Sequence, residues 1–222
     1  MGGAFDPKND LWRTVSLVTD VCGLSFLWVV ACLPVVTIGP ATAALYFAVV
    51  RYVRRREDGA FRAFFRSFRM NLRQGVLATL IILLPAFLLQ LGWRMCRTMA
   101  ASASGGYGLL AFYSLLMVLP LGALMYLFPL LGRFTFSLGD LFRTAARLTL
   151  AHLPTSLCLV ILFAVGAMLC LQFLLPLFFL PALVALASSL LLEKVFRRYA
   201  PEQEEDCLLY TSPSPRDGLL SR

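Results

Sequence analysis

One long apolar run near the start of the chain, Val15 to Val50, constrains the fold more than any other feature. Proline, threonine and glycine residues in Leu33–Ala43 break this run at its centre, and arginines at Arg51 and Arg54–Arg56 follow its end. A helix needs about 20 apolar residues to cross the ~30 Å hydrocarbon layer of a bilayer. The run is too long for one crossing and slightly short for two, so we expect two helices that meet in a turn at Thr37–Pro40.

The composition indicates that lipid is the solvent for most of the chain. Hydrophobic residues make up 59% of the 222 residues and charged residues only 14%, with a mean hydropathy of +0.79. A soluble domain of this length would lack the polar residues to cover its surface. We therefore expect an all-α, polytopic helical membrane protein with six transmembrane helices, or five if the first run crosses once. The expected spans are about 15–35, 40–56, 75–93, 109–131, 153–171 and 176–192.

Basic residues predict the orientation, because cytoplasmic loops of membrane proteins are enriched in lysine and arginine. With six spans, sixteen basic residues share one side with both termini, and only Arg94 and Arg97 lie opposite. With five spans and an outside N-terminus, the division is fourteen against four. The count favours six spans with both termini in the cytoplasm.

The loop after the arginine block predicts an amphipathic helix over residues 60–73. The pattern places two stripes about 110° apart at 100° per residue. The apolar stripe consists of Phe61, Phe64, Phe65, Phe68 and Leu72, and the basic stripe of Arg62, Arg66, Arg69 and Arg73. This pattern is typical of a helix in the headgroup layer, with aromatics at the acyl boundary and arginines on anionic headgroups. Such a helix either fixes the topology or also docks a partner, and the sequence leaves both open.

The last residues, 207–222, resemble the translation of a sequencing adapter, so we expect a single membrane domain at 1–206 and a non-native tail. The remaining five cysteines form no C-x-x-C pair, and one histidine, His152, stands alone. We find no catalytic triad, phosphate-binding loop or metal-ligand spacing. The sequence therefore predicts no enzyme activity, no cofactor, no metal site and no nucleic-acid partner.

Asp20 is the one carboxylate inside an apolar run. An acid within the membrane is a functional candidate by default. An ion pair with Arg13 or with the arginine block is an equally good explanation. The other candidates lie in the break of the first run: Thr37, Gly39 and Pro40.

From Phe5 to about Arg198 the chain resembles the DUF624, or YesL-like, membrane proteins of Gram-positive bacteria. The residues that carry the resemblance are Gly3, Phe5, Pro7, Trp12, Asp20, Trp28, Leu33–Ala41 and the block Phe61–Gly75. The resemblance implies a bacterial plasma-membrane protein encoded beside carbohydrate uptake systems of the ABC type and their regulators. It supplies no established activity and no catalytic residues.

Two functions follow as hypotheses. The first is an accessory component that associates with a carbohydrate ABC permease or sensor protein through the basic stripe or its span surfaces. The alternative is a small-solute transporter or channel that uses Asp20 and Thr37. A water-accessible cavity that reaches Asp20 would favour the transporter, and a closed bundle would favour the accessory protein.

Overall fold

The computed structural model describes residues 10–54, 59–102, 106–134, 136–173 and 175–199. The predicted tail at 207–222 and the family residues Gly3, Phe5 and Pro7 lie outside these ranges. The α-helices are α1 (Asp10–Ala31), α2 (Ile38–Ala48), α3 (Ala60–Ser102), α4 (Gly106–Arg133), α5 (Leu138–Ala151), α6 (Leu153–Gln172) and α7 (Leu180–Tyr199). Short helical segments are η1 (Val35–Thr37), η2 (Val49–Arg54) and η3 (Leu175–Phe178). The described residues contain no strand, which confirms the all-α class.

Three helices, α3, α4 and α6, are long and apolar enough to cross a membrane. Leu17–Ala31 and Val35–Arg51 form shorter apolar helices. Large hydrophobic side chains are exposed along α3, α4, α6 and Leu17–Ala31, as expected where lipid covers the surface, whereas Val35–Arg51 exposes them only at Val35 and Val36. The structure therefore supports a membrane-embedded protein.

The break in the first apolar run forms a compact turn, a few residues earlier than Thr37–Pro40. Helix α1 ends at Ala31, and α2 starts at Ile38. The hydroxyl of Thr37 lies 2.7 Å from the carbonyl oxygens of both Ala31 and Pro34, so it can donate to either. This hydroxyl satisfies backbone carbonyls that the helix end leaves without partners.

Helix α2 lies in the middle of the molecule and touches its neighbours almost backbone to backbone. A Cβ atom on Gly39 would come within 2.7 Å of the carbonyl oxygen of Gly75 in α3. A Cβ atom on Gly132, in α4, would come within 2.6 Å of the carbonyl oxygen of Ala43. Small residues allow such close helix crossings in membranes. The proline–glycine motif is thus a packing contact between α2 and α3.

The predicted amphipathic helix at 60–73 and the predicted span at 75–93 are one continuous helix, α3, of 43 residues. At 1.5 Å per residue it is about 64 Å long, roughly twice the hydrocarbon thickness. Residues 71–77 contain no proline, and Asn71 Nδ2 donates to the carbonyl of Ser67 within the helix, 3.0 Å away. The distance along the axis from Arg73 to Arg94 is about 31 Å, which matches one crossing.

The aromatic stripe of this helix does not lie wholly at the acyl boundary as predicted. Phe64 is buried in a cluster with Leu24 of α1 and Leu45 of α2, and Phe68 stacks on Phe64 with ring centroids 6.2 Å apart. Only Phe61, Phe65 and Leu72 of the stripe are exposed. The reason is that α2 runs antiparallel to the first half of α3 and offers its own apolar surface to the aromatic face.

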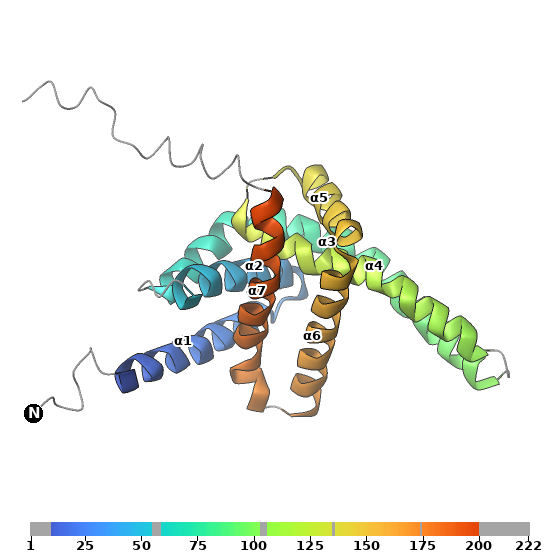
Figure 1. The fold of residues 1–222 in the computed structure, drawn as a ribbon, viewed down its shortest axis with the longest axis horizontal. Coiled ribbons are helices and arrows are strands. Elements are labelled where there is room, and N and C mark those ends of the chain that lie inside the picture. Colours follow the sequence, from blue (N-terminus) through green and yellow to red (C-terminus); the bar gives the residue numbers. More distant parts are fainter. Residues whose placement is uncertain (1–9, 55–58, 103–105, 135, 174, 200–222) are drawn as a thin grey trace, which may run out of the picture.

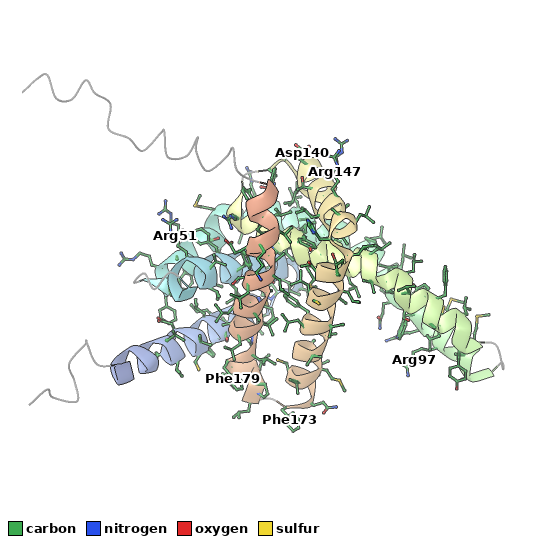
Figure 2. The ribbon with its side chains drawn as sticks, viewed as in Figure 1. Arg51, Arg97, Asp140, Arg147, Phe173 and Phe179 are labelled. Atoms are coloured by element: carbon green, nitrogen blue, oxygen red, sulfur yellow. The ribbon has the colours of Figure 1, made fainter. Side chains whose placement is uncertain are left out.

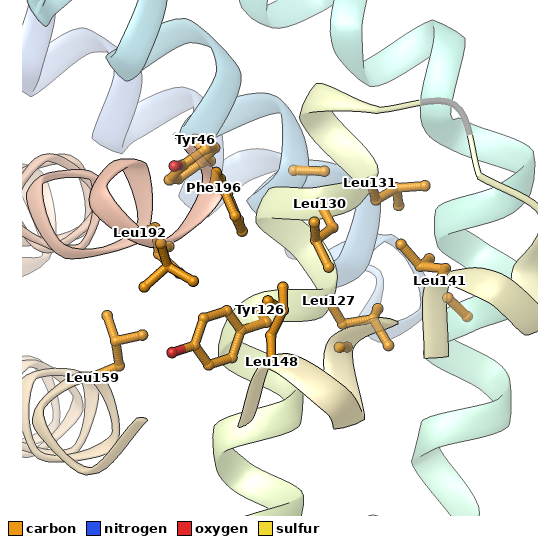
Figure 3. Close-up of a cluster of buried hydrophobic side chains, with 14 residues drawn as sticks. Tyr46, Tyr126, Leu127, Leu130, Leu131, Leu141, Leu148, Leu159, Leu192 and Phe196 are labelled. Atoms are coloured by element: carbon orange, nitrogen blue, oxygen red, sulfur yellow. The ribbon is translucent and has the colours of Figure 1, made fainter. Parts of the chain in front are cut away.

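A second cluster holds helices α2 to α7 together (Figure 3). Tyr126 of α4 lies at its centre, fully buried, with Leu159 of α6 and Leu192 of α7 around it. Helix α5 was not predicted as an element. Its buried face comprises Leu141, Ala145, Leu148 and Thr149, and Ser137 caps its start by accepting from the amide of Asp140.

The helix ends separate into two sides (Figure 1). The first turn of α1, the adjoining ends of α3 and α4, and the adjoining ends of α6 and α7 lie toward one side. Helix α5 and the end of α7 at Tyr199 lie toward the other.

The glycine contact of α2 generates a prediction about stability. We expect Gly132→Ala to lower the free energy of unfolding by about 1–3 kcal/mol, because its Cβ meets a backbone carbonyl that cannot move away cheaply. Gly139→Ala in α5 is the matched control, since nothing lies within 4 Å of the added carbon, and it should cause no loss. Thermal unfolding in detergent measures both, and equal stability of the two variants would contradict the close crossing.

Candidate functional site

The four arginines of the predicted basic stripe form one exposed row on α3. Arg62, Arg66, Arg69 and Arg73 are all exposed, whereas Phe64, on the opposite face, is buried. At 100° per residue the four side chains leave the helix within an arc of about 60°, and they cover about 16 Å of its length. We call these four residues the arginine face. It points away from the helices that α3 packs against.

Further basic residues lie on other elements. Arg143 and Arg147 are exposed on α5, as is Lys194 on α7. Arg51 lies over the ring of Phe47, with its guanidinium carbon 5.8 Å from the ring centre. Figure 2 shows Arg51 and Arg147 at a distance from Arg97, which lies near the far end of the α3 and α4 pair.

An ion pair between a partly buried arginine and a buried glutamate joins the end of α4 to α7. Arg133 donates to the carboxylate of Glu193, whose side chain is only 7% exposed. The guanidinium also lies over the rings of Phe134 and Phe196, 5.6 and 5.9 Å from their centres. A carboxylate buried in this way is costly without a partner, so the pair holds the two helices in one register.

The sequence pattern does not reveal this pair, because Arg133 resembles one more basic residue of a loop and Glu193 resembles an ordinary boundary residue. The signal that could have found Glu193 is its position in the last helix between Leu192 and Val195, both of which are buried. A carboxylate between two core residues requires a cation nearby.

The other end of α7 is fixed by a second polar contact. Ser25 of α1 is fully buried, and its hydroxyl oxygen accepts from the amide of Ala182, 3.1 Å away. Amides in the first turn of a helix have no partner within the helix, so this hydroxyl satisfies one of them. Helix α7 is therefore anchored to α1 near its start and to α4 near its end.

The structure does not gather the four predicted site residues into one site. Asp20 is half-buried on α1, eleven residues before Ala31, which is about 16 Å along the helix. Thr37 bonds to the turn, and Gly39 and Pro40 are buried against α3. Thr37 thus has a structural role in the turn before α2, and Gly39 and Pro40 have structural roles in the contact between α2 and α3.

Two cavities lie between the helices. One, of about 470 Å³, lies among α1, α2, α4, α6 and α7, and the other, of about 650 Å³, lies among α3, α4 and α5. Asp20 lines neither. Across the described residues, no group of three or more histidine, cysteine, aspartate or glutamate side chains could hold a metal ion.

The fold and these sites define a helical membrane protein with a basic face and an apolar interior. Residues 21–93 match the family described as "Protein of unknown function, DUF624". This match confirms the DUF624 assignment over a segment that contains the second half of α1, all of α2, the arginine face and the membrane-crossing part of α3. No curated protein and no solved structure matches the chain.

The ion pair generates a prediction that distinguishes the interaction between the two charges from the packing of each side chain. We expect Arg133→Met to lower the free energy of unfolding by about 3–5 kcal/mol, because it leaves the buried carboxylate of Glu193 uncompensated. Glu193→Leu should lower it by less, because the side chain of Arg133 is 20% exposed. The double variant should lose less than the sum of the two. Unfolding of the wild type, the two single variants and the double variant in detergent measures these free energies. Strictly additive losses would show that the two charges do not interact.

Proposed function

We propose that this protein is an accessory component of the bacterial plasma membrane that associates with carbohydrate ABC-type uptake or its regulation. The observation that carries the docking role is the arginine face, which is exposed on the side of α3 opposite the bundle. The carbohydrate context rests on the family resemblance. The partner is a permease or sensor protein with acidic groups on its cytoplasmic surface.

The arginine face is suited to docking because it is rigid. Its helix continues for 43 residues and is fixed to α2 through Gly75 and Phe64. Guanidinium groups bind carboxylates and phosphates in a bidentate manner, which gives orientation as well as attraction. A row of four on a fixed helix therefore presents a preorganised cationic strip to an acidic partner or to anionic headgroups.

A small-solute transporter or channel is the alternative, and the structure offers it less support. Such a protein needs polar groups along a path through the membrane. The two cavities are lined almost entirely by apolar side chains, and neither includes Asp20. A cavity that reached Asp20 would have favoured the transporter, and neither cavity does, so the accessory role is favoured.

The arginine face and the C-terminus lie in the cytoplasm in this proposal, as the count of basic residues indicates. The first turn of α1 lies on the same side as the adjoining ends of α3 and α4 and of α6 and α7 (Figure 1). This arrangement favours five crossings with the N-terminus outside over the six expected. Helix α2 and the adjoining η2 together have 17 residues, at most about 25 Å, which is short for one crossing. They pack along the first half of α3 rather than along its apolar second half. The crossings would then be α1, the second half of α3, α4, α6 and α7.

Cysteine labelling tests this topology. In a variant without native cysteines, we expect a membrane-impermeant maleimide to label Asp10→Cys and Tyr107→Cys in intact cells. Arg147→Cys should react only after permeabilisation. If Asp10→Cys also required permeabilisation, the six-crossing topology with both termini in the cytoplasm would be correct.

Crosslinking in native membranes tests the docking role. We expect the wild-type protein to recover a carbohydrate permease or sensor subunit, and Arg66→Ala/Arg69→Ala to recover about tenfold less, equivalent to about 1.4 kcal/mol. Arg94→Ala/Arg97→Ala is the control, because it removes the same charge from exposed positions at the other end of α3. Recovery of neither kind of subunit by the wild-type protein would reject the proposal.

A further inference from the structure

We propose that the cavity among α1, α2, α4, α6 and α7 binds one acyl chain of a bilayer phospholipid. Its volume of about 470 Å³ is far larger than the voids that close-packed interiors leave. It falls in the range of small-molecule sites, about 300–1,000 Å³. This site does not depend on the docking role of the arginine face.

The lining of the cavity selects an uncharged, apolar occupant. No charged residue is among the described residues that line it. The hydroxyls of two lining residues are already engaged, because Thr42 donates to the carbonyl of Ile38 at 2.7 Å and Ser188 to that of Ala185 at 2.9 Å. The indole of Trp28 donates to Thr42 in turn, 3.3 Å away. A polar solute would lose its water here without gaining equivalent hydrogen bonds.

The position of the cavity identifies the source of the occupant. Its lining follows α6 from Phe163 to Leu171 and α7 from Leu180 to Ser188, about 12 Å along each helix. It begins where α6 and α7 adjoin, the end marked by Phe173 and Phe179 in Figure 2. Leu171 lines the cavity there and is 88% exposed. The apolar lining is thus continuous with the lipid-facing surface, so a chain can enter alongside α6.

Contacts around the cavity explain why the helices do not collapse into it. Helices α6 and α7 already touch closely at Gly166, where a Cβ atom would lie 3.0 Å from Val184. Helix α7 is anchored by Ser25 and by the Glu193 ion pair, and the lining residues Val184, Ala185 and Ser188 lie between these two anchors. The α6 and α7 hairpin therefore forms a wall held at a fixed distance from α2 and α4.

Fluorescence of Trp28 tests the site, because Trp28 lines the cavity from α1. The protein carrying Trp12→Phe and Trp93→Phe is placed in nanodiscs of phospholipid with brominated acyl chains. We expect Ala167→Phe, which fills the cavity from α6, to reduce quenching of Trp28 at least twofold. Ala164→Phe is the matched control one turn away on the same helix; it lies outside the lining and should leave quenching unchanged.

Two outcomes would overturn the site. One is quenching of Trp28 that Ala167→Phe leaves unchanged, which would place the bromine atoms in the bulk lipid. The other is strong quenching by acrylamide from water with none by the brominated lipid, which would show a hydrated cavity. If Ala167→Phe does not give folded protein, Cys170→Phe fills the same cavity and is judged by the same comparison.

Discussion

The close contact of α2 with the backbones of α3 and α4 is the constraint on which the rest of the structure depends. It requires Gly75 on one side and Gly132 on the other, because any side chain there would meet a neighbouring backbone or the ring of Pro40. The small residues let the backbones approach closely, so van der Waals contact adds to the burial of the apolar side chains of α2. The α2 helix therefore packs between α3 and α4 and exposes little of its own surface.

This contact also fixes the geometry of the basic face. Helix α3 continues without interruption from the arginine face into the membrane, and α2 packs along its first half through Pro40, Leu45 and Val49. The arginines thus have one orientation relative to the transmembrane part. Helix α7 is placed by separate means, the Ser25 contact and the ion pair between Arg133 and Glu193.

The sequence predicted the features that depend on local pattern. Apolar length predicted a helical membrane protein, and the spacing of Arg62 to Arg73 predicted one exposed basic row. The sequence did not predict that α3 is continuous or that Phe64 is buried, because both depend on α2 lying beside it. It also missed Glu193, since a charge at the end of an apolar run resembles an ordinary boundary residue until its partner on α4 is known.

The burial of Phe64 bears on the choice that the sequence left open. A helix that only fixes topology in the headgroup layer turns its aromatic side to the acyl chains and its arginines to the phosphates. Here α1 and α2 cover Phe64 and part of Phe68, while Phe61, Phe65 and Leu72 stay exposed. The contacts of Phe64 within the protein already hold this part of α3 in place. Attraction to lipid is then not required to position the helix. The four arginines on the face opposite that contact therefore support the docking role that we propose.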